Sequence, residues 1–212
     1  QIEDGRGAFL VNLILGVEPN GLYVRRPDND QTWAAQGELP PLRDVAAWLD
    51  LAPLSLPAAQ IARVDVAPQA GPGYSLVREN ADAGFHLIGA RAALSQSVLD
   101  SIGEAIAQIS PIDVQPAPAI QGAPRARVHI ATFDQVGIDA ELIDSGGKTW
   151  LKLVARADAP EHEPAALEIN NRAAAWAYGL SPADIDRLAP PLANLLPQPP
   201  AAPPPRSPTP TP

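Results

Sequence analysis

The chain contains no cysteine and no methionine. Without cysteine there is no disulfide, no thiol nucleophile and no thiolate ligand for a metal ion. That composition suits an exported protein without disulfides as well as a cytoplasmic protein. Because the sequence starts at Gln1 and has no initiator methionine, we expect a processed or truncated N-terminus and a longer natural chain.

Basic residues and long apolar runs are also scarce. Lysine and arginine number 15 against 24 aspartate and glutamate, for a net charge of -9. This balance disfavours nucleic acid and anionic membrane surfaces as partners, since both need clustered cations. No apolar run approaches the roughly 20 residues that span a bilayer, so membrane contact is expected only through a segment outside this chain. The 212 residues, 46% of them hydrophobic, suffice for one sizeable core or two small ones.

The clearest predicted element is an amphipathic helix over residues 95–109. At about 100° per residue, its apolar side chains fall within one arc of roughly 140°. Ser95 or Ser97 offers an N-cap oxygen, and Pro111 stops the helix just past its end. Gly103 lies at the edge of the apolar arc, and we interpret it as a contact where a strand approaches closely. The buried face is predicted to hold Leu94, Val98, Leu99, Ile102, Ala105, Ile106 and Ile109.

The residues before this helix are rich in β-formers. Segments 9–15, 22–24 and 31–35 are separated by turn residues, which predicts a small antiparallel meander. Asp44 is expected to cap a short helix over residues 45–51. Three further strands, 61–66, 74–79 and 85–88, are predicted ahead of the organising helix.

A second meander is predicted after the helix and a proline-rich connector, 115–124. Its strands are 127–133, 137–143 and 149–155, with a hairpin turn at Asp144-Ser145-Gly146-Gly147.

The second meander resembles the first in the order of its parts. Gly21-Leu22-Tyr23 leads through a polar turn to Thr32-Trp33, and Gly137-Ile138-Asp139 leads likewise to Thr149-Trp150. We therefore predict a tandem repeat in which the first unit lacks its helix in this chain.

The C-terminal part is predicted to be helical before a proline-rich tail. One helix is expected over residues 163–180, and Ser181-Pro182 caps another that runs to Leu196 with an interruption at Pro190-Pro191. The first of these is predicted to bury Ala166, Ile169, Ala173, Trp176 and Leu180.

The tail, residues 197–212, has too few apolar side chains to fold and favours polyproline II. We expect it to contact a protein partner. The predicted partner-binding residues are Pro199, Pro200, Pro203, Pro204, Pro205 and Arg206.

Together these patterns predict an α+β fold: tandem units of antiparallel β-meander plus packing helix, C-terminal helices and a proline-rich tail. Residues 1–36 form the second half of a first β-rich unit, and 37–60 a short helix and connector. Residues 61–155 form a complete second unit, 156–196 the C-terminal helices, and 197–212 the tail.

No pattern predicts a catalytic residue, a metal site or a cofactor. Gly147-Lys148-Thr149 looks like the end of a phosphate-binding loop, but Leu142 stands where the motif needs glycine, and the triplet leads into a strand. His86 and His129 lie on predicted strands beside apolar residues, as hydrogen-bonded structural histidines do. His162, between two glutamates, has no remote ligand to complete a metal site.

The four tryptophans fall on predicted strands or helix faces. Each is expected to pack in the core rather than to anchor a ligand or a partner. They are Trp33, Trp48, Trp150 and Trp176.

The sequence from Leu22 to Val66 resembles a known family. LYVRRPDNDQTWAA followed by DVAAWLDLAPLSLPAAQIARVDV is similar to the core of bacterial domain-of-unknown-function family 4340. The shared positions include Tyr23-Val24-Arg25, Trp33, and Trp48-Leu49-Asp50. They continue through Leu56-Pro57-Ala58 to Ile61, Val64 and Val66.

The last helices of that family also resemble Asn171-Arg172, Trp176-Ala177-Tyr178 and Leu180. The family's N-terminal membrane helix and first half-repeat are absent from this chain, and the proline tail is foreign to its pattern. The resemblance implies a soluble domain held outside the cytoplasm by a membrane anchor, near auxiliary components of gliding-type ABC transport systems. It assigns no catalytic residue.

The sequence thus predicts a non-enzymatic cell-envelope accessory or scaffold protein of a membrane-associated assembly, linked to a transporter. Its expected location is the periplasm or the extracytoplasmic face of a bacterial membrane. The expected partners are proteins.

Two alternatives stay open. The first is a periplasmic module that binds a small ligand, glycan or peptide in a cleft between the repeat units, with Trp33 or Trp150 stacking on it. The second is a hydrolase, which would need His129 or His86 within hydrogen-bonding reach of an acid in an open pocket.

Overall fold

The chain divides by its internal contacts into two units, Gln1–Leu49 and Asp50–Pro212. The computed structural model describes residues 2–3, 9–18, 21–37, 51–90 and 94–196.

Two predicted segments lie outside the described residues. One is the short helix over 45–51, of which only Leu51 is described, and the other is the proline-rich tail. The predicted α+β class is confirmed by the remaining elements, which include antiparallel sheets and several helices.

The second unit is built on one eight-stranded antiparallel sheet. Its strand order is β8-β7-β6-β10-β11-β12-β13-β9. The strands are β6 (Ile61–Pro68), β7 (Tyr74–Val77), β8 (His86–Leu87), β9 (Asp113–Pro116), β10 (Pro124–Thr132), β11 (Val136–Ser145), β12 (Lys148–Ala157) and β13 (Trp176–Leu180).

The predicted meander forms the centre of this sheet. Strands β10, β11 and β12 are consecutive neighbours, and Ser145 pairs with Lys148 across the β11–β12 hairpin. The two turn residues, Gly146 and Gly147, have φ angles of 61° and 76°. Positive φ at both central positions is the requirement of a type I′ turn, which glycine meets without steric cost.

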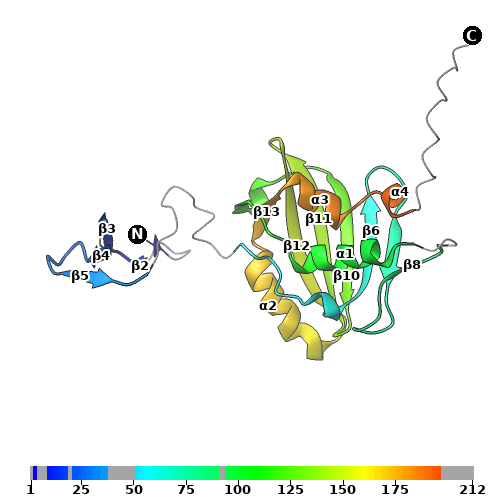
Figure 1. Ribbon diagram of the computed structural model, residues 1–212, viewed down its shortest axis with the longest axis horizontal. Coiled ribbons are helices and arrows are strands. Elements are labelled where there is room, and N and C mark those ends of the chain that lie inside the picture. The colour runs from blue at the N-terminus through cyan, green and yellow to red at the C-terminus, as the bar shows by residue number, and fades with distance from the viewer. Residues whose placement is uncertain (1, 4–8, 19–20, 38–50, 91–93, 197–212) are drawn as a thin grey trace, which may run out of the picture. The chain divides into compact units, whose positions relative to one another are not determined.

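Helices cover one face of the sheet, as Figure 1 shows for α1 and α3. Helix α2 packs along β12. The helices are α1 (Gln96–Ala107), α2 (Glu163–Ala173), α3 (Pro182–Leu188) and α4 (Leu192–Leu195), with 3-10 turns η2 (Ala58–Gln60), η3 (Ala117–Ala119) and η4 (Pro160–His162).

Helix α1 confirms the prediction for residues 95–109 to within a turn at its C-terminal end. Its predicted stripe is buried at Leu99, Ile102 and Ile106, but Val98, also predicted to be buried, is 39% exposed. Gly103 is a packing contact, as expected, but its neighbour is the ring of Phe85 rather than a strand. A Cβ on Gly103 would lie 2.6 Å from Phe85 Cε2.

Alternate residues of the central strands face opposite sides of the sheet. On β10, Val128 and Ile130 are buried beneath the helices, whereas Arg127 and His129, which alternate with them, are exposed. This period-two pattern gives the sheet a helix-covered inner face and an outer face. The outer face is covered at its β13 end, where Trp150 packs with Ile120, Ile143 and Ala177.

The prediction of a helix over residues 163–180 is wrong beyond Ala173. Residues Trp176–Leu180 form β13, which pairs with β12 on one side and β9 on the other. The helical reading placed Trp176 on a buried face, yet this side chain is 43% exposed. Cross-strand pairing overrode the helical period, because Tyr178 and Leu180 reach the core from a strand.

The proline-rich connector, 115–124, also differs from expectation, since it contributes strand β9. Proline has no backbone N–H to donate to a neighbouring strand. Pro116 is tolerated in β9 because β9 is an edge strand of the described sheet, with a neighbour on one side only. At its other end, Asp113 accepts a hydrogen bond from the backbone N–H of Val114 and one from Lys148 Nζ at 2.6 Å. These contacts hinder the addition of another strand at this edge.

The first unit contains a three-stranded antiparallel sheet of order β3-β4-β5. A three-stranded meander was predicted here, and its strands are β3 (Ile14–Glu18), β4 (Gly21–Arg25) and β5 (Thr32–Ala35). The predicted first strand, 9–15, is wrong in its bounds, because β3 begins only at Ile14. Strands β1 (Ile2–Glu3) and β2 (Phe9–Val11) form a separate antiparallel pair. The predicted tandem repeat stays a prediction.

Asn170 extends the sheet where strand pairing ends. Strand β13 pairs with β12 only from Thr149 to Lys152, so the free edge of β12 beyond that point needs other partners. The Asn170 amide supplies them: its Oδ1 accepts from Ala155 N and its Nδ2 donates to Ala155 O, both at 2.8 Å. Helix α2 is thereby fixed to the edge of the sheet.

Asn170→Ala should therefore destabilise the protein. It leaves the N–H and C=O of buried Ala155 without their partners, at an expected cost of about 1–3 kcal/mol in the free energy of unfolding. Denaturant titration measures this cost. Asn171→Ala, at an exposed position on the same helix, is the matched control and should change stability by less than about 0.5 kcal/mol. Equal effects of the two substitutions would contradict the role given to Asn170.

Candidate functional site

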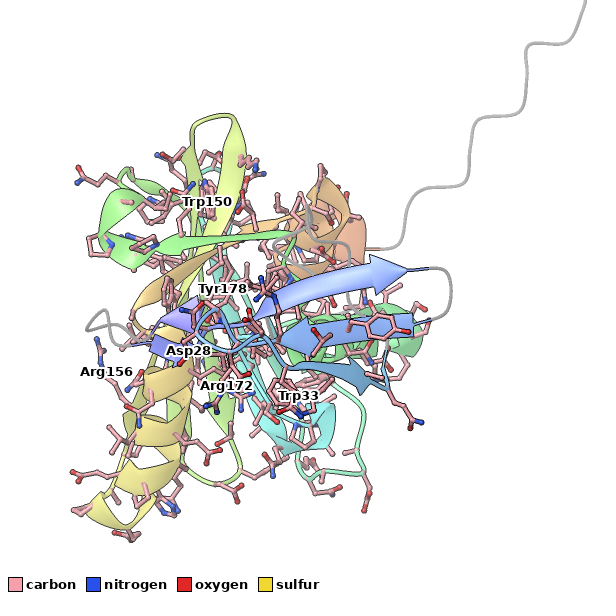
Figure 2. All side chains as sticks on the ribbon, turned by 90° about the vertical axis from the view of Figure 1, so that its left-hand side faces the viewer. Asp28, Trp33, Trp150, Arg156, Arg172 and Tyr178 are labelled. Atoms are coloured by element: carbon pink, nitrogen blue, oxygen red, sulfur yellow. The ribbon has the colours of Figure 1, made fainter. Side chains whose placement is uncertain are left out.

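The outer face of the sheet carries oppositely charged groups on neighbouring strands. His129 on β10 lies opposite Asp139 on β11, and His129 Nδ1 is 2.8 Å from Asp139 Oδ1. The other oxygen of that carboxylate, Oδ2, is 3.0 Å from Arg156 Nη1 on β12. Figure 2 shows Arg156 extending away from the body of the sheet. One acid therefore orients a histidine and an arginine.

Asp65 on β6 flanks His129 on the other side, since the two residues are register partners. Arg63 Nε donates to both oxygens of this carboxylate, at 2.9 and 2.8 Å, and Ser75 on β7 donates its hydroxyl. Burial alone raises the pKa of Asp65, but the hydrogen bonds from Arg63 and Ser75 outweigh it and lower the pKa. The same contact raises the pKa of Arg63.

A second row of charges runs beside the first. Arg127 Nε donates to Glu141 Oε1 at 3.0 Å, and Glu141 pairs in register with Lys152. Lys152 Nζ donates to the backbone carbonyl of Ile120 at 2.5 Å. This bond fastens the segment that covers Trp150, and it marks where the open part of the outer face ends.

These side chains line a pocket of about 520 Å³ on the outer face. The ionisable residues that line it are Arg127, His129, Asp139, Glu141, Lys152 and Arg156. Both charge signs are present and most of the charges are paired within the face. Such a surface favours a partner with a matching charge pattern over a simple anion or cation.

The His129–Asp139 pair meets the geometric condition set for a hydrolase, because the histidine has an acid within hydrogen-bonding reach beside a pocket. An aspartate at Nδ1 fixes the imidazole tautomer and leaves Nε2 to accept a proton. The described residues that line this pocket include no serine, threonine, tyrosine or cysteine to act as nucleophile. With the described lining residues, the pair can act as a base on a water molecule or on a bound ligand.

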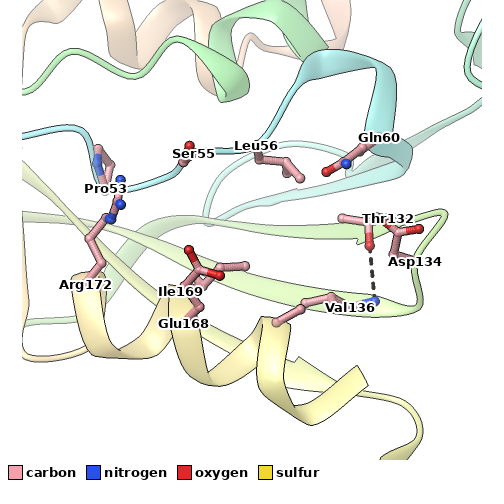
Figure 3. A pocket seen from close by; sticks show the side chains of 11 residues that line it. Pro53, Ser55, Leu56, Gln60, Thr132, Asp134, Val136, Glu168, Ile169 and Arg172 are labelled. Carbon is pink, nitrogen blue, oxygen red and sulfur yellow. Dashed lines mark hydrogen bonds between the residues drawn. The ribbon is translucent and has the colours of Figure 1, made fainter. Parts of the chain in front are cut away.

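A second pocket, of about 260 Å³, lies between the segment before β6, the β10–β11 turn and α2. Figure 3 shows Glu168 and Arg172 of α2 on one side, and Gln60 and Asp134 on the other. The Thr132 hydroxyl accepts a hydrogen bond from Val136 N at 3.1 Å, which closes the turn. That hydroxyl serves the turn rather than a ligand.

The residues singled out in the sequence are not gathered at either pocket, apart from His129. His86 is exposed on β8, and His162 ends the turn before α2. Among the residues that the structure describes, no group of three or more histidine, aspartate or glutamate side chains is placed to hold a metal ion.

The tryptophans differ in their surroundings. Trp150 is 3% exposed and donates Nε1–H to Ser145 O at 3.1 Å, so it packs in a core as expected. Trp33 and Trp176 are 40% and 43% exposed, which contradicts the expected core packing of these two. Trp48 and the predicted partner-binding residues Pro199, Pro200, Pro203, Pro204, Pro205 and Arg206 lie outside the described residues.

Sequence reasoning missed Asp65, Asp139 and Glu141 as members of the outer face. The available signal was charge at every second position of strands 61–66 and 137–143, between apolar residues. This alternation predicts that the charges face solvent. Only the strand order and register, however, show which charge lies opposite which.

The geometry defines the class of the larger unit: an α+β domain built on one antiparallel sheet with helices on one side. Comparison with protein-family models, with curated proteins and with solved structures finds no match for this chain. No helix in the described part of the chain has the length and apolar character required to cross a membrane.

Asp65→Asn should reduce stability in a pH-dependent way. A carboxylate whose pKa is lowered on folding adds stability above its ordinary value of 3.8, and this contribution is lost as the pH falls through the lowered value. We expect the variant to be less stable than the parent by about 1 kcal/mol at pH 7, with a difference that shrinks below pH 3.8. Denaturant titration across this range measures it.

Asp186→Asn is the control for this experiment, because Asp186 is exposed on α3 and makes no side-chain hydrogen bond in the described part of the chain. Its stability difference from the parent should stay near zero at every pH. A difference for Asp65→Asn that does not change with pH would refute the linkage.

Proposed function

We propose that this chain is a non-enzymatic accessory or scaffold protein of a membrane-associated assembly in the bacterial cell envelope. In this proposal the open part of the outer face, over strands β6, β10, β11 and β12, is the surface that holds a protein partner.

The observation that carries the proposal is the arrangement of charges on this face. Arg127, His129 and Arg156 stand on rigid, hydrogen-bonded strands, and acids on β11 hold each of them in place. Side chains fixed in this way lose little conformational entropy when a partner binds. Rows of opposite charge also fix the register of a partner and exclude partners with the wrong pattern.

The same face offers little for catalysis. Its histidine is oriented, but the described pocket lining lacks a nucleophilic hydroxyl. The side chains of His129 and Asp139 are 48% and 42% exposed, whereas catalytic acids and bases work best where water is excluded. These features support a binding role.

The location in the envelope has a different support, namely the resemblance of residues 22–66 to the envelope family described above. That resemblance also supports the link to a transporter. It concerns the sequence alone, and it leaves the partner's identity open.

A small-ligand or glycan/peptide-binding module in the periplasm is the alternative. The outer-face pocket of about 520 Å³ supports it, since this volume falls within the range of ligand sites. Buried Trp150 cannot stack on a ligand without leaving its core, so the charged side chains would have to supply most of the recognition.

The double variant Arg127→Glu/Arg156→Glu should disrupt the proposed assembly. The two side chains are 66% and 75% exposed, so the fold should persist while the charge pattern is reversed. We expect the native complex isolated from the cells that make the protein to lose its partner, with at least a tenfold drop in co-purified partner per molecule of this chain. Native mass spectrometry measures the stoichiometry.

Arg187→Glu on helix α3 is the matched control, because Arg187 is also exposed, at 51%, and lies on the helix side. It should leave the complex intact. A parent protein that is monomeric and alone in these preparations would overturn the scaffold proposal. Saturable binding of a small molecule to that monomer, abolished by the double variant, would establish the alternative.

A further inference from the structure

The small sheet of the first unit has one apolar face. Register places Leu15, Val24 and Trp33 in one row across β3, β4 and β5, and Leu22 beside Ala35 in the next row. We call the surface formed by these five side chains the Trp33 face. It contains no charged side chain.

The Trp33 face is open among the residues that the structure describes. Leu15 is 38% exposed and Trp33 40% exposed, and no side chain described on the three strands is buried. A small antiparallel sheet gains stability in water when an apolar face is covered. An exposed aromatic side chain within a row of apolar neighbours is also typical of a recognition surface.

Acidic residues lie next to this face. The β4–β5 turn contains Asp28 and Asp30, and β5 with Trp33 follows directly. Asp30 Oδ1 is 3.6 Å from Arg25 Nη1, whereas Asp28 makes no ion pair in the described part of the chain. Asn29 Oδ1 accepts from Gln31 N at 2.8 Å and holds the turn in shape. The turn that leads into β5 thus carries an exposed carboxylate, that of Asp28.

We propose that the Trp33 face binds a polyproline II segment of a partner protein, and that this segment carries an arginine. A polyproline II helix is already extended and stiff, so it loses little entropy on binding, and its proline rings pack on the face of an indole. The rows of Val24 and Leu15 continue this apolar contact across the sheet. The arginine pairs with Asp28, which has no other partner among the described residues, and this pairing fixes the direction of the bound segment.

The sequence of residues 197–212 has the required chemistry, with a run of three prolines followed by Arg206 as its only charged side chain. A peptide of this sequence is therefore a suitable probe. The Trp33 face belongs to the first unit and the outer face to the second, so the two proposals are tested by different variants.

The test is calorimetric titration of the peptide 197–212 into the full chain and into the chain ending at Leu196. We expect saturable binding that Trp33→Ala weakens at least tenfold, since a central aromatic anchor carries much of the binding energy. Asp28→Asn should weaken binding a few-fold and remove its dependence on salt. Thr32→Ala, on the opposite face of β5, is the matched control and should bind as the parent does.

Changes in the peptide keep the test valid if Trp33→Ala unfolds the small sheet. Replacing Pro203, Pro204 and Pro205 by alanine should weaken binding about tenfold, and Arg206→Ala should mimic Asp28→Asn. Combining Asp28→Asn in the protein with Arg206→Ala in the peptide should weaken binding no further than either change alone. The proposal would be overturned if the unchanged peptide, the peptide with three alanines and a scrambled peptide bound equally well. It would also be overturned if no binding were detected at millimolar peptide.

Discussion

The larger unit depends on the alternation of apolar and charged side chains along β10, β11 and β12. Because successive residues of a strand face opposite sides, a slip of one residue in any pairing would carry Arg127, His129 or Glu141 into the core. Burying an unpaired charge costs several kcal/mol. The register is therefore fixed, and with it one face that must be covered by helices and one that can stay open.

The sequence predicted those elements whose structure depends on residues close together in the chain. Most of the apolar stripe of α1, though not Val98, and the glycines of the β11–β12 hairpin were predicted correctly, since helix period and turn conformation are encoded within a few residues. Strands β9 and β13 were missed because they exist through pairing with each other and with β12. The sequence shows charged residues of the outer face at every second position of a strand. Which charges pair with one another follows only from the order of the strands.

The two units present different surfaces for contact. The second unit offers a rigid face of charges that are mostly paired with one another, including Asp65 with Arg63 and Asp139 with Arg156. The first offers an apolar face with an exposed tryptophan. In our proposal, both surfaces hold extended or flat protein partners.

The central claim is that the outer face of the second unit is covered by a partner in the native assembly. Carboxyl footprinting with mass-spectrometric detection tests it, using the protein alone and in membranes of the cells that make it. Asp139 and Glu141, 42% and 40% exposed, should be labelled in the isolated chain and protected in the assembly. Glu104, exposed on α1, should be labelled equally in both. Unchanged labelling of Asp139 and Glu141, or protection confined to Glu104, would contradict the account.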